Sequence, residues 1–401
     1  MNYMGMVANS PVALKKPLVW QMPGTSRDGK TVFYNGSMCS LGQELKKLTD
    51  KKILLITGKH LLLSEMKEIL YQVLDRENLS YDVISDIPPE PHLDTVEKIA
   101  VLMDTSEYGA VVGIGGGSVM DIAKIAAHGG DGKLLDRAAN DRFTQKRFPL
   151  VLLPTTSGTG SEISPYAVLT VNDKKKFYTS SELLPTIAII DPVLAAAMPG
   201  NVTAATAFDA MTHALEGNMA CPVPYTECLA VESAALVFQF LPIAVKDGSD
   251  IEARYYLSMA SVMGMLSYVM GGGLYAHSIS YILTTEKQQP HGVGCGLALP
   301  FTMAFNEVYI GALLDRLGSR CFGRDGTKEL RRRVIENIRE LYIQSGFPET
   351  LETLGYTMSD SGSFAANLLG NYERIKNPRK MHEDEAKLLF ESMFVGQMQY
   401  F

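Results

Sequence analysis

Residues 108–124 read YGAVVGIGGGSVMDIAK, and this stretch decides the class of fold. The apolar run at 110–114 predicts a buried strand, the glycines at 115–117 predict a tight turn, and the apolar spacing that follows predicts a helix. Ser118 can cap that helix, and Asp121 is expected in its first turn. Such a turn directs free N–H groups and the positive end of a helix dipole at one point. We therefore expect it to hold phosphate.

A second loop, PTTSGTGSE at residues 154–162, follows the apolar run FPLVLLP. Its small and hydroxyl-bearing residues allow a ligand to approach the backbone closely, so we expect it to form the second wall of a nucleotide site. The glycine turn lacks the Lys-Ser/Thr of a P-loop and does not fit GxGxxG. It predicts a diphosphate cradle of another type, whereas the glycines alone would also suit a plain strand-to-helix turn.

Strand and helix patterns alternate along the chain up to residues 185–199. The expected strands are KILLIT, YDVIS, GAVVGIG, FPLVLLP and TIAIID, with helical stretches such as SEMKEILYQVLDREN between them. This alternation predicts a parallel α/β sheet. Helical periodicity dominates afterwards, as in TECLAVESAALVFQFLPIAV and KELRRRVIENIRELYIQSG. We predict an α/β nucleotide-binding domain over residues 1–198 and an all-α metal-binding, catalytic domain over residues 199–401.

Four residues of the second half predict a metal site. Asp209 and His213 are four residues apart, so on a helix they lie one turn apart on the same face. His277 and His291 can complete the set. One carboxylate and three imidazoles suit Fe(II) or Zn(II) better than Ca²⁺ or Mg²⁺. A spacing of this kind is also common in helices without metal, where histidines form ordinary hydrogen bonds, and the nucleotide loops upstream favour the metal site.

Composition limits the classes of partner and location. A length of 401 residues permits two domains with sizeable cores, and a net charge of −7 with short basic runs gives no reason to expect nucleic acid. The sequence contains no uninterrupted apolar run of about 18 residues, so we expect a cytoplasmic protein without a membrane partner. The cysteines are sparse, odd in number and not in metal-type pairs, and they are expected to be buried or free thiols: Cys39, Cys221, Cys228, Cys295 and Cys321.

The ordered motifs resemble those of the iron-dependent (group III) alcohol dehydrogenases from about Thr31 to the C-terminus. The motifs are GGGSVMDIAK, PTTSGTGSE, IIDPVLAAAMP, TAATAFDAMTHALEG, the segment from His277 to PHG, and NPR at residues 377–379. The resemblance implies a dehydroquinate synthase-like architecture, NAD(H) or NADP(H), Fe²⁺ or Zn²⁺, and a homodimer. It places the metal ligands at Asp209, His213, His277 and His291. The residues expected to contact the nucleotide are Gly58, Gly116, Gly117, Ser118, Asp121, Thr155, Thr156, Thr159, Lys176 and Leu194.

The resemblance implies a metal-dependent alcohol dehydrogenase or aldehyde reductase that acts on a short-chain aldehyde or primary alcohol. The metal would polarise the carbonyl oxygen while the nicotinamide carries the hydride. Relatives often have another histidine where this chain has Tyr281, which could relay a proton or line the pocket. Two other classes are an NAD- and metal-dependent lyase similar to dehydroquinate synthase, and a binding protein with an inactive site. The lyase would need more basic residues in its site than this chain offers. The binding protein would not need an intact set of metal ligands, which this chain has.

Two positions concern specificity. Relatives that prefer NAD commonly carry an aspartate at the position of Gly58, which would repel the 2′-phosphate of NADP. Glycine removes that repulsion, with Lys59 and His60 adding donors, unless Gly58 serves only the turn. NADP(H) is therefore allowed and slightly favoured. Arg374 could hold a carboxylate, sulfonate or phosphonate of an anionic aldehyde, or it could pair with Glu373 or Asp360 on the surface.

Overall fold

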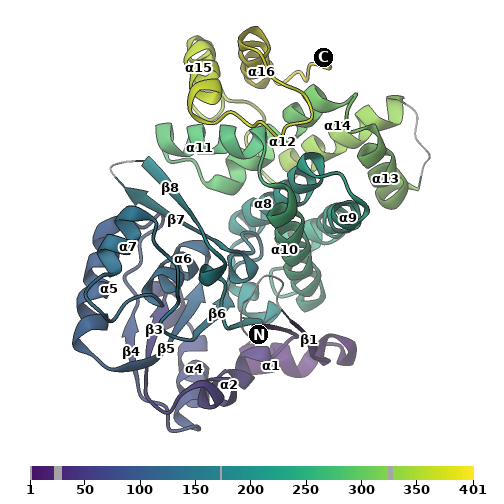
Figure 1. Ribbon diagram of the computed structural model, residues 1–401. Helices are drawn as coiled ribbons and strands as arrows, with labels where there is room; N and C mark the ends of the chain where they lie inside the picture. The colour runs from purple at the N-terminus through teal and green to yellow at the C-terminus, as the bar shows by residue number, and fades with distance from the viewer. Residues whose placement is uncertain (1, 22–28, 172–173, 324–327) are drawn as a thin grey trace. The chain divides into compact units, whose positions relative to one another are not determined.

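The chain forms two compact units, which are described separately (Figure 1). The computed structural model describes residues 2–21, 29–171, 174–323 and 328–401. Unit 1 comprises Met1–Met198 and Ser249–Ser258, and unit 2 comprises Pro199–Gly248 and Met259–Phe401.

The segment Ser249–Ser258 belongs to unit 1, whereas the sequence pattern assigned it to the helical domain. Ser258 Oγ lies 2.8 Å from Ser157 Oγ, and the buried Arg254 donates from Nη2 to the carbonyl of Met198 at 3.1 Å. These contacts connect the start of α10 to unit 1. The division into functional domains at residue 198 stays a prediction.

Unit 1 is built on a sheet of seven strands in the order β1-β2-β9-β6-β5-β3-β4. Only the β1–β2 pair is antiparallel. The strands are β1 Leu18–Gln21, β2 Lys30–Phe33, β3 Lys52–Thr57, β4 Tyr81–Ile84, β5 Tyr108–Gly115, β6 Leu150–Pro154 and β9 Ile187–Ile190, and the hairpin β7 Tyr166–Val171 with β8 Lys174–Thr179 stands apart. The predicted parallel sheet is confirmed. Strands β1 and β2, which were not predicted, extend it, and the unpredicted strands β7 and β8 form a sheet of their own.

Alternate residues of the strands fill two cores, one on each face of the sheet. Ile53 and Leu55 of β3 belong to one core, and Leu54 and Ile56 belong to the other. This is the period of two expected for a strand buried on both faces. Helices α1, α2 and α4 contribute to the first core, and α5, α6 and α7 contribute to the second. The helical segments are α1 Tyr3–Asn9, η1 Val12–Lys15, η2 Ser37–Ser40, α2 Leu41–Leu48, α3 Lys59–Leu62, α4 Met66–Asp75, α5 Leu93–Thr105, α6 Gly117–Ala126, α7 Leu134–Asn140, η3 Ser161–Ile163, η4 Ser181–Leu183 and η5 Pro192–Ala197.

Unit 2 is helical, as predicted. Its helical segments are α8 Gly200–Ala220, α9 Pro224–Lys246, the greater part of α10 Ile251–Gly271, α11 Tyr275–Lys287, α12 His291–Asn306, α13 Gly311–Phe322, α14 Lys328–Gln344, η6 Met358–Asp360, α15 Ser361–Asn371 and α16 Glu383–Val395. Helix α8 packs closely on α12, because a Cβ added at Gly292 would lie 1.9 Å from the carbonyl oxygen of Ala205. Helix α8 also approaches α10, where a Cβ added at Gly217 would lie 2.4 Å from the carbonyl carbon of Ser267. Small residues therefore bring the helices that carry the predicted ligands together.

Helix α9 is apolar enough to deserve comparison with a membrane span. Among the described residues, α9 passes on length and composition, and the bent pair α10 and α11 would pass if it were one span. Half of the apolar stretch of α9 is buried inside the protein, and the helix packs against α8 and α13. A core helix explains this composition.

Candidate metal centre and nucleotide loops

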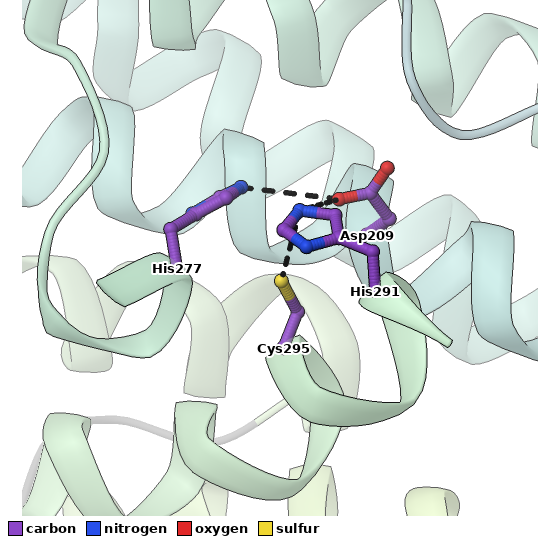
Figure 2. A group of neighbouring side chains, drawn as sticks. All are labelled: Asp209, His277, His291 and Cys295. Atoms are coloured by element: carbon purple, nitrogen blue, oxygen red, sulfur yellow. Dashed lines mark hydrogen bonds and ion pairs between the residues drawn. The ribbon is translucent and has the colours of Figure 1, made fainter. Parts of the chain in front are cut away.

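The four predicted metal ligands meet in unit 2. Asp209 and His213 lie on α8, His277 lies in the first turn of α11, and His291 is the first residue of α12. The Nε2 atoms of His213 and His277 each lie 3.8 Å from Asp209 Oδ1, and that of His291 lies 3.6 Å from it. Figure 2 shows Asp209, His277 and His291 turning toward one another from three helices.

The geometry of these atoms fits a transition metal. Ligand bonds of about 2.1 Å in a tetrahedral arrangement separate neighbouring donor atoms by about 3.4 Å, close to the distances between Asp209 and the imidazoles. Among the described residues, Asp209 Oδ1 and His277 Nε2 are buried without a hydrogen-bond partner. Buried polar atoms normally have a hydrogen-bond partner. Because these two atoms have none, they are suited to binding a cation.

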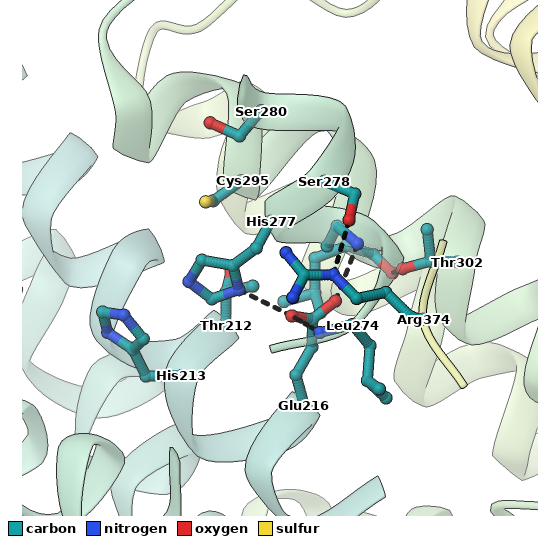
Figure 3. Close-up of polar contacts among 12 residues, drawn as sticks. Thr212, His213, Glu216, Leu274, His277, Ser278, Ser280, Cys295, Thr302 and Arg374 are labelled. Carbon is teal, nitrogen blue, oxygen red and sulfur yellow. Dashed lines mark hydrogen bonds and ion pairs between the residues drawn. The ribbon is translucent and has the colours of Figure 1, made fainter. Parts of the chain in front are cut away.

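Two hydrogen bonds behind the imidazoles fix the direction of their lone pairs, and Figure 3 shows the one between His277 and Glu216. His277 Nδ1 lies 2.6 Å from Glu216 Oε2, so the ring donates its Nδ1 proton and keeps a lone pair on Nε2. Ser280 Oγ lies 2.9 Å from His291 Nδ1 and 2.7 Å from the His291 carbonyl oxygen. Because a hydroxyl has one proton to donate to the carbonyl, it accepts from Nδ1. Both Nε2 atoms are therefore in the form that binds metal.

Glu216 organises the start of α11. Its carboxylate is fully buried and accepts from the backbone N–H of Leu274 at 2.6 Å and of Ala276 at 2.7 Å, in addition to His277. Burial raises the pKa of Glu216 to about 7, and the two backbone donors and the charge of Arg374 oppose that rise. Glu216 thus anchors the backbone and the ring of one predicted ligand together.

Burial also controls the charges of the donor atoms. It lowers the pKa of His277 well below the usual range, aided by the neighbouring His213, which keeps the imidazole neutral. Burial raises the pKa of Asp209, and the nearby His291 and His277 oppose this rise. A divalent cation would favour the ionised carboxylate and neutral imidazoles together.

Three residues beside the predicted ligands were not predicted from the sequence to belong to the site. Cys295 is buried, and its Sγ lies 3.5 Å from His291 Nε2. The donor atoms of Asp209, His277, His291 and Cys295 lie within 4.8 Å of one another. Glu216 and Ser280 are the other two. Helical spacing could have found them, because Cys295 follows His291 by four residues, and Glu216 and Ser280 follow His213 and His277 by three.

Tyr281 lies one helical turn after His277. Its ring stacks on the imidazole of His291, with centroids 5.3 Å apart and an angle of 12° between the planes. Burial raises the pKa of Tyr281 well above its usual range, so the phenol stays protonated at neutral pH. This position is compatible with lining the pocket and with holding a proton, and the choice between the two roles stays a prediction.

Arg374 contacts α11 and not the two acidic residues considered from the sequence. Its Nε donates to Ser278 Oγ at 2.7 Å, and its guanidinium carbon lies 6.0 Å from the centre of the Tyr281 ring. Among the described residues it forms no ion pair with Glu373 or Asp360, so the surface-pair alternative is wrong. Ser278 also donates to the carbonyl of Tyr372 at 2.9 Å, which anchors this part of the chain to α11.

The two loops predicted to hold the nucleotide lie side by side in unit 1. The Thr155 N–H donates to the carbonyl of Gly115 at 3.0 Å. A Cβ added at Gly116 would lie 3.5 Å from Thr156 Cγ2, and one added at Gly117 would lie 3.1 Å from Thr159 Cγ2. A side chain would therefore be tight at Gly117 but would make an ordinary contact at Gly116, and the turn places the N-terminus of α6 beside the threonines.

The start of α6 differs from the prediction. The N-cap is Gly116, which has no side chain to cap the helix, and Ser118 lies inside the first turn. Ser118 Oγ instead accepts from the N–H of Glu90 at 3.2 Å. Asp121 lies beyond the first turn, where it accepts from Ser161 Oγ at 2.8 Å and from the Val168 N–H at 3.0 Å. The N-cap thus lies two residues before Ser118. The carboxylate of Asp121 connects α6 to the segments that carry Ser161 and Val168.

The remaining cofactor candidates have different surroundings. Lys176 Nζ donates to the carbonyls of Ala138 at 3.3 Å and Ala139 at 2.5 Å, and Leu194 is buried in the first core of unit 1. Gly58 precedes α3 with φ of −84°, so its backbone does not require glycine. A Cβ there would meet only Val119 Cγ2, at 4.0 Å. Lys59, next to Gly58, pairs with Asp86 at 2.6 Å on the surface.

A parallel α/β unit with a glycine turn and a helical unit with converging carboxylate and imidazole donors are the parts that a metal-dependent dehydrogenase requires. The model of the iron-containing alcohol dehydrogenases matches residues 28–192, and the model of the C-terminal part of the Fe-containing alcohol dehydrogenase family matches residues 203–394. The chain belongs to this family. It is an oxidoreductase, and the predicted iron and nicotinamide nucleotide are the cofactors of the family.

Named relatives agree with this assignment. The chain is 30% identical over 371 residues to long-chain-alcohol dehydrogenase 1 of Geobacillus thermodenitrificans (strain NG80-2). The aligned residues cover 90% of this chain and 94% of that relative. The solved structure of 1,3-propanediol oxidoreductase matches with a TM-score of 0.84 at 25% identity, covering 94% of this chain and 99% of that one. Sulfoacetaldehyde reductase from Bifidobacterium kashiwanohense, in complex with NAD+, matches with a TM-score of 0.81 at 26% identity and coverages of 93% and 98%. The dimer and the cytoplasmic location stay predictions.

Proposed function

We propose that this alcohol dehydrogenase interconverts a short-chain aldehyde and its primary alcohol, using NAD(H) or NADP(H) and a divalent metal held by Asp209, His213, His277 and His291. The observation that carries the proposal is the convergence of the three Nε2 atoms on Asp209 Oδ1 at 3.6 to 3.8 Å. When bound, the metal supplies Lewis-acid polarisation of a carbonyl oxygen and the nicotinamide supplies a hydride.

The side chains around this cluster have distinct tasks. Asp209 reduces the net positive charge of the site and helps to retain the ion. Glu216 and Ser280 hold Nδ1 of His277 and His291, which keeps each Nε2 free of a proton. Tyr281, stacked on His291, lines the site with a phenol that stays protonated.

The nucleotide is proposed to bind unit 1 through the glycine turn and the threonine loop. The first-turn N–H groups of α6 suit a diphosphate, because the Gly116 N-cap offers no side-chain oxygen to them. Lys176 and Leu194 stay candidate contacts. Gly58 leaves space for the 2′-phosphate of NADPH, so the proposal gives NADPH a slight preference over NADH.

A second substrate class is an aldehyde with an anionic group, and Arg374 favours it. Its Nε is held by Ser278, and within the described part of the chain its Nη atoms donate no hydrogen bond. A guanidinium positioned in this way suits a carboxylate or sulfonate. One structural relative is named for sulfoacetaldehyde, an aldehyde with a sulfonate.

The test is a panel of neutral and anionic short aldehydes assayed with NADH and NADPH after anaerobic loading with Fe(II). Asp209→Asn and His277→Ala are expected to lose turnover together with bound metal while the far-ultraviolet circular dichroism is kept. Full activity of metal-free His277→Ala would overturn the metal assignment. Arg374→Ala is expected to lower kcat/KM for anionic aldehydes more than for neutral ones, and an unchanged ratio would remove the anionic class.

A further inference from the structure

Cys295 lies among the proposed metal ligands in a position that the known motifs of the chain do not explain. It follows His291 by one turn of α12, so both side chains lie on one face of the helix. Cys295 is fully buried, and its Sγ belongs with Asp209, His277 and His291 to the set of donor atoms within 4.8 Å of one another (Figure 2).

The distance between Cys295 and His291 suits two ligands of one ion. With a metal–sulfur bond of about 2.3 Å and a metal–nitrogen bond of about 2.1 Å, tetrahedral geometry separates the two donor atoms by about 3.6 Å. Cys295 Sγ lies 3.5 Å from His291 Nε2. The same distance suits a thiol that donates a weak hydrogen bond to the imidazole, so the experiment has to separate these two roles.

The backbone around Cys295 is held tightly. A Cβ added at Gly294 would lie 2.7 Å from Ser280 Oγ, and one added at Gly296 would lie 2.7 Å from the ring of Tyr342. These contacts fix the segment of α12 that carries Cys295 against α11 and α14. The buried Asp209 Oδ1 and His277 Nε2, which have no hydrogen-bond partner among the described residues, independently indicate that a cation belongs at this point.

We propose that Cys295 is a direct ligand of the metal together with Asp209, His277 and His291, the three residues whose donor atoms form one group with its Sγ. On binding, the Sγ–H bond breaks, a sulfur–metal bond forms, and the proton leaves to solvent without any change of oxidation state. A thiolate is a softer donor than carboxylate or imidazole, so it makes the site more selective for Zn²⁺ over hard cations such as Mn²⁺. The inference rests on the proposed metal site and is independent of the substrate.

Cobalt(II) provides the direct test, because a thiolate ligand gives a sulfur-to-cobalt charge-transfer band in the near ultraviolet, which carboxylate and imidazole ligands lack. The metal-free full-length protein is titrated with Co²⁺ alone. We expect this band in the wild type and its loss in Cys295→Ser and Cys295→Ala, while the visible ligand-field bands of bound cobalt remain. Cys321→Ser, which removes a partly buried thiol on α13, is the matched control and should keep the band.

A second measurement compares metal affinities by competition with a chelator. The Cys295 variants should lose Zn²⁺ affinity by at least the roughly 10- to 100-fold that loss of an outer-shell partner costs, with little change for Mn²⁺. Circular dichroism checks that each variant is folded. Because serine and alanine differ in size and polarity, a loss of affinity in both variants is due to the missing thiol.

The possible outcomes separate this inference from the proposed function. Visible cobalt bands without a charge-transfer band in the wild type, or a band that persists in both Cys295 variants, would overturn the role of Cys295 and leave the other ligands in place. No binding of cobalt to the folded wild type would overturn the metal site as well.

Discussion

Replacing Glu216 by glutamine should weaken metal binding although no proposed ligand is changed. One carboxylate oxygen, Oε2, accepts from both the Leu274 N–H and His277 Nδ1, and Oε1 accepts from the Ala276 N–H. Glutamine keeps the shape but turns one of these acceptors into a donor. If the amide nitrogen takes the Oε1 position, it faces the N–H of Ala276. If it takes the Oε2 position, it faces Leu274 and pushes the proton of His277 onto Nε2, the atom that should bind metal.

The magnitude follows from these contacts. Each orientation leaves at least one buried donor without its charged acceptor, and hydrogen bonds to charged groups contribute about 1.5–3 kcal/mol each. Outer-shell partners of metal-binding histidines typically change metal affinity by about 10- to 100-fold, which corresponds to about 1.4–2.7 kcal/mol. We expect a loss of Zn²⁺ affinity in this range for Glu216→Gln.

The assay is competition for Zn²⁺ between the metal-free protein and a chromophoric chelator, with kcat measured at saturating metal. The matched control is Glu162→Gln, which changes a buried glutamate of unit 1 by the same atom and should leave the affinity unchanged. Wild-type Zn²⁺ affinity in folded Glu216→Gln would refute the argument that this carboxylate fixes the protonation of His277.

Three further predictions concern the cofactor and the stability of the two units. Gly58→Asp should lower kcat/KM for NADPH by roughly tenfold or more, about 1.4 kcal/mol, while NADH is spared; equal effects on both cofactors would show that this position does not face the 2′-phosphate. Burial lowers the pKa of His128 from 6.5 to about 4, so its contribution to the free energy of unfolding is complete above pH 6.5 and about 3 kcal/mol is lost as the pH falls to 4. In urea unfolding at several pH values, the free energy of unfolding of His128→Asn should depend less on pH than that of the wild type. The same dependence on pH in both proteins would contradict this. Gly292→Ala, whose Cβ would lie 1.9 Å from the Ala205 carbonyl oxygen, should cost about 1–3 kcal/mol and lower Tm, whereas Gly362→Ala, in open space, should not.

Local spacing in the sequence determined the parts of the molecule that one element contains. The run from residues 108 to 124 indicated a strand, a glycine turn and a helix, because strand and helix periodicities are properties of the backbone. The same reasoning paired Asp209 with His213, since four residues make one helical turn. It did not find β1 and β2, whose runs are four residues each and gain their order from pairing in the sheet.

The choice of partners across different elements depended on the tertiary structure. Only the packing of α8, α11 and α12 brings Asp209, His277 and Cys295 together, and that packing depends on close backbone contacts at glycines far apart in the sequence. Arg374 likewise donates to Ser278, nearly a hundred residues away, and not to its acidic neighbour Glu373. The reason is that Tyr372, two residues before Arg374, is hydrogen-bonded to Ser278 of α11. Spacing along the sequence determines which side chains share a helix face. It does not show which faces pack together, because that depends on the burial of whole apolar surfaces.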